Sequence, residues 1–124
     1  MNPITIGIVS PLAHDKLPPA GPGMYPGVKF IARGVGVKAL TPEGYDDAWN
    51  GIVPAAVALA QQGVDAILVH GASLTFYRGH EAHEKLLANV RSATGLPAIT
   101  MTAAMVEGLR HLGAKQIGVC TAYS

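Results

Sequence analysis

The feature that most constrains the fold is a regular alternation of short apolar runs with longer segments of helical character. The apolar runs cover residues 4–9, 28–32, 64–69, 97–102 and 116–121. Strands that alternate with helices are joined by crossovers, which produces a parallel sheet with helices on both faces. The sequence therefore predicts an α/β fold built on a doubly wound, flavodoxin-like parallel sheet.

Capping residues and glycines mark the expected helices. The sequence TPE at residues 41–43 supplies a capping threonine, a first-turn proline and a first-turn acid, so a helix is predicted from there to Gln62. Pro54 bends this helix or sets a later start. Further helices are predicted over residues 78–93 and 103–112. The proline- and glycine-rich residues 18–23 predict a loop without regular structure.

Two strand segments resemble each other, namely IGIV at residues 6–9 and IGVC at residues 117–120. Each precedes a short polar turn. We interpret the second segment as the beginning of another α/β unit. Residues 1–99 then form a first domain with half of a cleft, and residues 100–124 begin a second domain that is truncated. On this interpretation the chain is a fragment.

The composition excludes several classes of protein. Apolar residues make up 49% and charged residues 14%, with a net charge of +1 and no basic stripe, so nucleic acid is not an expected partner. The longest apolar run, residues 52–60, is too short to span a bilayer, and the N-terminus has no signal-peptide pattern. The lone Cys120 fits a reducing compartment, so we expect a cytoplasmic protein and an inert thiol inside a buried strand.

The strongest candidate site follows the apolar run 64–69, where Gly71, Ala72 and Ser73 lie at the carboxyl end of a predicted strand. Ligands bind at such ends in open α/β sheets. Backbone N–H groups in a turn of this kind can hold an anion, and Ser73 adds a hydroxyl donor. An ordinary turn capped by Ser73 explains the same residues equally well. Tyr123, beyond the last apolar run, is suited equally to function and to packing.

Two other motifs are weaker. Residues 34–36 (GVG) lack the third glycine of a dinucleotide-binding fingerprint, which favours a plain turn. His80 and His83 are near each other on a helix but have one residue too few between them for the zinc-protease pairing. A solvated helix face is favoured for these histidines, and no metal is expected.

Four segments resemble the arylmalonate decarboxylase family, within the aspartate/glutamate racemase and maleate isomerase superfamily. They are TPEGYD (41–46), SLTFYRG (73–79), ATGLPAIT (93–100) and TAY (121–123). The resemblance runs over nearly the whole chain but over only about the first half of a typical member. It implies two similar α/β domains with the active site in the cleft between them, and no cofactor or metal.

The resemblance also implies roles for individual residues. Gly71 matches the glycine that the decarboxylase has where the racemases carry a cysteine. Ser73 and Tyr123 match hydroxyl donors of the hole that holds an enediolate, and Ala72 stands where the decarboxylase has threonine. In addition, Tyr45 and Pro11 match residues that line the pocket. The cysteine that protonates the enediolate belongs to the second half of the family's chain, and Cys120 does not match it.

The expected function is therefore cofactor-free decarboxylation of arylmalonate-type dicarboxylates. The expected partners are a small dicarboxylate substrate and the remainder of the chain or a second domain, and the 124-residue chain alone is expected to be inactive. A maleate isomerase or an amino-acid racemase is the alternative, although the missing thiol at Gly71 speaks against both. A non-catalytic carboxylate-binding module is the alternative from another class, favoured by Ala72 and the missing cysteine.

Overall fold

The described residues form a single parallel sheet of four strands. The computed structural model describes residues 2–17 and 19–122. The strands are β1 (Thr5–Ser10), β2 (Lys29–Gly34), β3 (Ala66–Val69) and β4 (Ala98–Thr100), in the order β2-β1-β3-β4. All three pairings are parallel. The chain passes from β1 to β2 on one side and to β3 on the other, which is the flavodoxin-like arrangement. The predicted α/β fold is confirmed.

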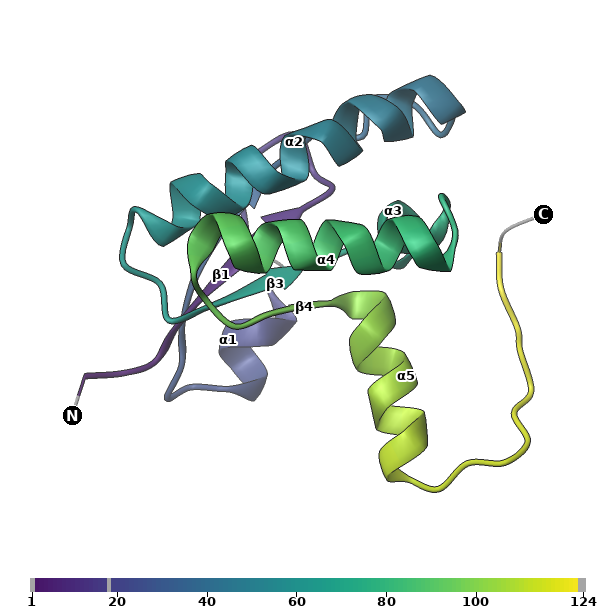
Figure 1. Cartoon of the computed structure of the whole chain (residues 1–124). Coiled ribbons are helices and arrows are strands. Elements are labelled where there is room, and N and C mark those ends of the chain that lie inside the picture. Colours follow the sequence, from purple (N-terminus) through teal and green to yellow (C-terminus); the bar gives the residue numbers. More distant parts are fainter. Residues whose placement is uncertain (1, 18, 123–124) are drawn as a thin grey trace.

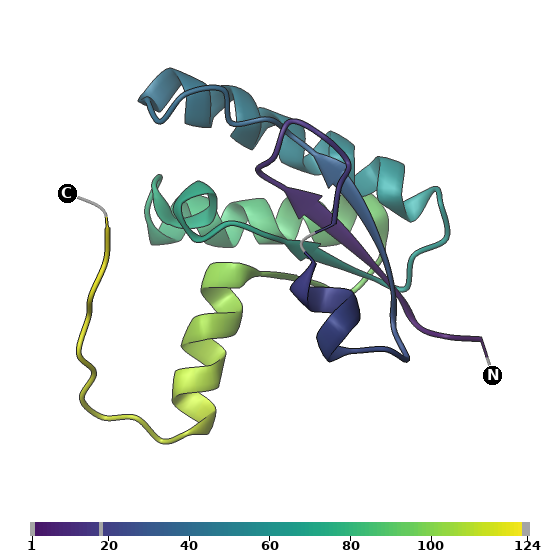
Figure 2. The same cartoon turned by 180° about the vertical axis from the view of Figure 1, so that it is seen from behind.

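Helices lie on both sides of this sheet. They are α1 (Ala20–Met24), α2 (Pro42–Ala60), α3 (Ala72–Phe76), α4 (His80–Thr94) and α5 (Met101–His111). The two long helices α2 and α4 pack against each other on one side of the strands, and α1 and α5 lie on the other side (Figure 1). The view from behind shows α5 descending away from the sheet (Figure 2). Among the described residues, no helix combines the length and the apolar character needed to cross a bilayer.

The core lies between the sheet and the helices α2 and α4. Val9 and Val69 of the two central strands are fully buried against Ile52 and Leu59 of α2. The inner face of α4 is formed by Leu86, Leu87 and Val90, which are buried. Each such side chain contributes about 1.5–3 kcal/mol when it leaves water, so this cluster holds the sheet and the long helices together.

The first long helix begins where its capping signal predicts. The side chain of Thr41 accepts a hydrogen bond from the backbone N–H of Gly44, with Pro42 in the first turn. The helix then continues through Pro54, so the predicted later start is wrong. The ring of Pro54 costs one backbone hydrogen bond. The buried residues Ile52 and Ala55 flank it, and their packing in the core offsets this loss.

Two predicted local structures are wrong. Residues 116–121, predicted as a fifth strand, pair with no other described strand, and residues 114–122 are exposed and lie away from the sheet (Figure 1). Their backbone groups have no neighbouring strand to bond, so the apolar pattern does not produce a strand. For the same reason Cys120 is exposed rather than buried. The loop predicted at residues 18–23 includes part of α1, because Pro22 falls in the first turn, where a helix needs no N–H donor.

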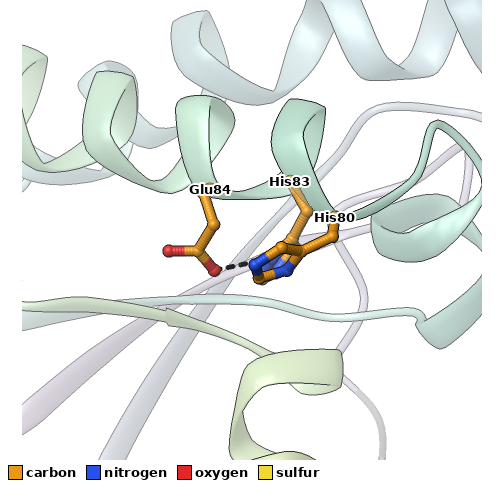
Figure 3. Close-up of side chains that lie close together, drawn as sticks. All are labelled: His80, His83 and Glu84. Atoms are coloured by element: carbon orange, nitrogen blue, oxygen red, sulfur yellow. Dashed lines mark ion pairs between the residues drawn. The ribbon is translucent and has the colours of Figure 1, made fainter.

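The solvated helix face predicted for His80 and His83 is only half correct. His80 is exposed, but His83 has only 5% of its surface accessible. His83 projects from α4 on the same side as His80 and Glu84 (Figure 3). Its Nε2 is 2.6 Å from Thr100 Oγ1, at the end of β4. The helix α5 begins directly after Thr100, and this junction of β4 and α5 covers His83. The spacing of the two histidines on α4 does not predict this burial.

Candidate active site

The candidate site lies where the carboxyl ends of β1 and β3 meet. Val9 of β1 pairs with Val69 of β3, and the two strands then lead into Pro11 and Gly71. A Cβ atom added to Gly71 would lie 3.1 Å from Pro11 Cγ, so the two residues are in close contact. The connections of β1 and β3 run to opposite sides of the sheet here, which opens the crevice where α/β proteins bind ligands.

Gly71 turns the chain abruptly from β3 into α3. Its φ of +103° and ψ of 106° lie in a region that residues with a side chain rarely adopt. The helix α3 starts at the next residue, so the backbone N–H groups of Ala72 and Ser73 fall in its first turn. The N–H groups of a first turn have no acceptor within the helix and remain available to a ligand.

The buried hydroxyl group of Thr75 stabilises this turn. Thr75 is fully buried, and its Oγ1 lies 3.0 Å from the carbonyl oxygen of Gly71 and 3.1 Å from that of Ala72. The hydroxyl of Thr102, in the first turn of α5, lies 2.6 Å from the same Thr75 Oγ1. These two carbonyl groups share their peptide planes with the N–H groups of Ala72 and Ser73. The bonds to Thr75 therefore fix the direction in which those two N–H groups point.

Tyr45 contacts the turn from α2. Its hydroxyl donates a hydrogen bond to Ser73 Oγ over 3.1 Å. Because Ser73 accepts this bond, its own hydroxyl hydrogen is free to be donated to an acceptor in the crevice. A donor that also accepts a hydrogen bond is polarised by it, so the pair forms a stronger donor than Ser73 alone.

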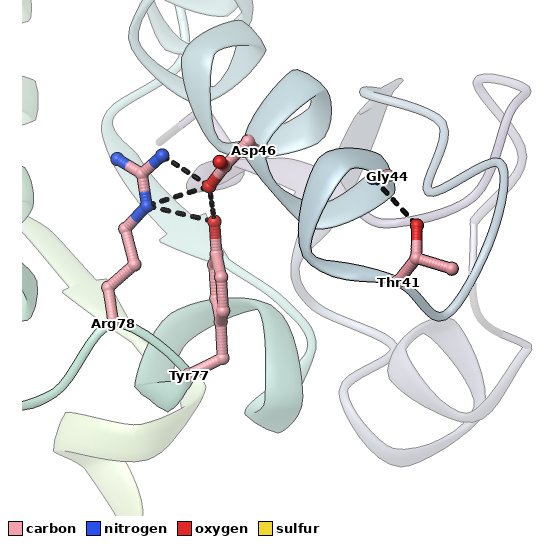
Figure 4. Close-up of polar contacts among 5 residues, drawn as sticks. All are labelled: Thr41, Gly44, Asp46, Tyr77 and Arg78. Atoms are coloured by element: carbon pink, nitrogen blue, oxygen red, sulfur yellow. Dashed lines mark hydrogen bonds and ion pairs between the residues drawn. The ribbon is translucent and has the colours of Figure 1, made fainter.

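A polar cluster beside the turn fixes Tyr45 in place. The ring of Tyr77 lies 5.0 Å from that of Tyr45, and the Tyr77 hydroxyl donates to the carboxylate of Asp46 on α2. Arg78 binds the same carboxylate (Figure 4). The Arg78 guanidinium also lies over the ring of Trp49. The bond from Tyr77, then that from Arg78, lowers the pKa of Asp46, whereas burial and the bond to Asp46 raise the pKa of Tyr77.

The structure brings five of the six expected site residues together: Pro11, Tyr45, Gly71, Ala72 and Ser73. The sixth, Tyr123, lies outside the described residues. The sequence did not identify the positioning contacts of Thr75 and Asp46. Tyr77 and Arg78 belong to the SLTFYRG segment quoted above, so two members of this cluster stood in a recognised motif. The sequence did not indicate that both side chains bind Asp46.

The strand order and the position of the turn define a flavodoxin-like α/β domain with its candidate site at the switch point of the sheet. A family model described as arylmalonate decarboxylase matches residues 6–124. The chain belongs to the arylmalonate decarboxylase family.

Known relatives agree with this assignment. The chain is 42% identical over 119 residues to arylmalonate decarboxylase of Bordetella bronchiseptica, covering 96% of this chain and 50% of the relative. A crystal structure of a mutant arylmalonate decarboxylase in a liganded form superposes with a TM-score of 0.84 at 42% identity, covering 89% of this chain and 47% of that one. The chain thus spans about half the length of the relatives it matches.

The fold is shared more widely. The structure of a maleate isomerase of Pseudomonas putida S16 with maleate superposes with a TM-score of 0.82 at 21% identity, covering 90% of this chain and 50% of that one. At this identity the likeness concerns the fold alone.

Proposed function

We propose that this chain supplies one half of the active site of a cofactor-free decarboxylase that acts on arylmalonate-type dicarboxylates. The observation that carries the proposal is the turn at Gly71. The backbone N–H groups of Ala72 and Ser73 lie in the first turn of α3, and the hydrogen-bonded hydroxyls of Tyr45 and Ser73 lie beside them. The 42% identity to a named arylmalonate decarboxylase supports the same activity. The second half of the site comes from the remainder of the protein or from a second domain.

In the proposed reaction the bond between the central carbon and one carboxylate breaks, and carbon dioxide leaves. The electron pair of that bond moves onto the remaining carboxylate, which becomes an enediolate with more negative charge on its oxygens. The N–H groups of Ala72 and Ser73 and the hydroxyl of Ser73 face this growing charge, with Tyr123 as a further hydroxyl donor. Donors placed where charge develops lower the barrier directly. The central carbon then takes a proton from a cysteine that this chain does not carry.

Two residues shape the proposed pocket without donating to the substrate. Gly71 carries no side chain at the tip of β3, and the ring of Pro11 stands so close that a Cβ atom added to Gly71 would lie 3.1 Å from Pro11 Cγ. At Ala72 the backbone N–H is present but the threonine hydroxyl of the family resemblance is absent. We infer that this difference lowers the stabilisation of an arylmalonate-derived enediolate or adapts the site to another acid.

We also propose that α5 and the residues after it begin the second domain, with the first domain ending near residue 99. The support is the exposure of apolar side chains there. Met105, Val106 and Leu109 on α5 are at least 37% exposed, as are Ile117 and Val119 beyond it. Apolar patches on a single segment are typical of surfaces that another part of a protein covers.

The second candidate function is a non-catalytic module that binds a carboxylate. It is favoured by Ala72, because the loss of a hydroxyl donor affects transition-state charge more than simple binding of an anion. An isomerase or racemase has less support, because Gly71 offers no thiol at the position where those enzymes use one.

A chimera tests the proposal. Residues 1–124 replace the matching part of the Bordetella bronchiseptica relative, and carbon dioxide release from phenylmalonate is measured. We expect turnover that Ser73→Ala lowers about 10²–10³-fold and that Ala72→Thr raises, while the 124-residue chain alone shows none. A folded chimera that binds phenylmalonate but does not turn it over, even with threonine at position 72, would support the binding module instead.

A further inference from the structure

A second group of polar side chains lies on α4, away from the turn at Gly71. His80, His83 and Glu84 each offer one ligand atom, and these atoms all lie within 4.8 Å of one another. Residues three and four apart share one face of a helix, and all three side chains project from the same side of α4 (Figure 3). They line a cavity of about 460 Å³ between α4 and α5, which gives a small ion access from solvent.

His83 and Glu84 have the spacing of two ligands on one metal ion. His83 Nδ1 lies 3.2 Å from Glu84 Oε1. Two ligand atoms that are each about 2.0–2.2 Å from a zinc ion lie roughly 2.8–3.6 Å apart, from octahedral to tetrahedral geometry. His80 and Glu84 are exposed, so their side chains have the freedom to close the remaining distance.

The buried ring of His83 is oriented by a partner on its other nitrogen. Its Nε2 lies 2.6 Å from Thr100 Oγ1, which also accepts a hydrogen bond from the backbone N–H of Ala103. Histidine ligands almost always have such a partner, because it fixes the ring and leaves the second nitrogen directed at the metal. Here that second nitrogen is Nδ1, the atom next to Glu84.

We propose that His80, His83 and Glu84 bind a divalent transition-metal ion of the zinc class. Two imidazoles and one carboxylate suit such ions better than magnesium or calcium, which prefer oxygen ligands. Because Thr100 both orients His83 and caps α5, the ion would stabilise the contact between α4 and the start of α5. The group shares no residue with the proposed decarboxylase site, so this inference stands independently of that activity.

The test is a titration of the 124-residue chain with zinc chloride, followed by calorimetry, and with cobalt chloride, followed by absorption. We expect one ion per chain and a rise in the thermal midpoint. His80→Asn and Glu84→Gln should each weaken binding at least about tenfold. The controls are Glu81→Gln on the same helix and His111→Asn at the end of α5, both exposed, and both should bind as the unmodified chain does. His83 is left intact because it is buried.

Each other outcome overturns the proposal. If zinc shows no saturable binding at one ion per chain, the contacts of His83 are only a hydrogen-bonded chain from Thr100 to Glu84. If the double variant His80→Asn, Glu84→Gln retains the affinity of the unmodified chain, the ion binds elsewhere. If His111→Asn weakens binding as much as His80→Asn, the binding is a general property of surface histidines.

Discussion

The hydroxyl groups of Thr75 and Thr102 lie 2.6 Å apart and join the short helix α3 to the first turn of α5. Thr75 Oγ1 also contacts the carbonyl oxygens of Gly71 and Ala72. The geometry of the turn at Gly71 therefore depends on a helix that we propose to belong to the second domain.

Replacing Thr75 by valine tests this dependence. The side chain is fully buried, and Thr75→Val removes the hydroxyl together with its contacts to Thr102 and to the carbonyl oxygens of Gly71 and Ala72. We expect the free energy of unfolding to fall by about 1–3 kcal/mol, measured by urea denaturation. Thr75→Ser keeps the hydroxyl and is the control, and it should lose less. A larger loss in the serine variant would mean that the methyl group, not the hydroxyl, matters at this position.

The bond between Tyr45 and Ser73 predicts a coupling between α2 and α3. Tyr45→Phe and Ser73→Ala each remove it, so the double variant should lose less stability than the sum of the single variants. We expect a coupling of about 0.5–1.5 kcal/mol in a double-mutant cycle. Strictly additive losses would show that the 3.1 Å contact contributes nothing in solution.

A comparison of Gly71 with Gly79, which both have a positive φ, distinguishes the effect of backbone strain from that of crowding. Gly71 has φ +103° and Pro11 beside it, whereas Gly79 has φ +83° and open space around its Cα. Alanine at either position should carry strain of about 1–3 kcal/mol. Gly71→Ala should lose a further 1–3 kcal/mol, roughly, from overpacking against Pro11. Equal shifts in the denaturation midpoints of the two variants would argue against the crowding.

Acid should remove the contribution of Asp46. The hydrogen bonds from Tyr77 and Arg78 lower its pKa below the ordinary 3.8, so folding favours the ionised carboxylate. That contribution is fully present above pH 3.8 and is lost as the pH falls through the lowered pKa. Asp46→Asn should therefore be less stable than the unmodified chain at neutral pH, with the difference shrinking in acid. Urea denaturation at a series of pH values measures this.

A neighbouring carboxylate provides the control for Asp46. Asp47 is exposed and lies next to Asp46 on α2. The stability of Asp47→Asn should follow that of the unmodified chain at every pH. If both variants show the same pH dependence, general surface charge accounts for the effect and the Tyr77–Asp46–Arg78 cluster does not.

Much of the fold could be predicted from local patterns. The run at residues 64–69 and the glycine after it identified β3 and the turn, because a buried parallel strand is apolar throughout and its abrupt end needs unusual backbone angles. Thr41 and Pro42 marked the start of α2, since capping depends only on neighbouring residues. These features are encoded within a few positions of one another.

The errors concern residues whose structure depends on distant partners. Residues 116–121 have the composition of a strand, but a strand exists only beside another one. His83 has the spacing of a surface residue, but its burial is decided by the junction of β4 and α5. The Tyr45–Ser73 bond joins residues 28 positions apart, and no local pattern predicts such a pairing.

The contact between Pro11 and Gly71 limits the routes by which this protein can evolve. Any side chain that arises at position 71 meets the ring of Pro11 at 3.1 Å, so a reactive group cannot be added there by one substitution without loss of stability. A compensating change at position 11 would have to come first or together with it. The two positions are therefore expected to be epistatic, because the ring of Pro11 has to shift before position 71 can accept a side chain.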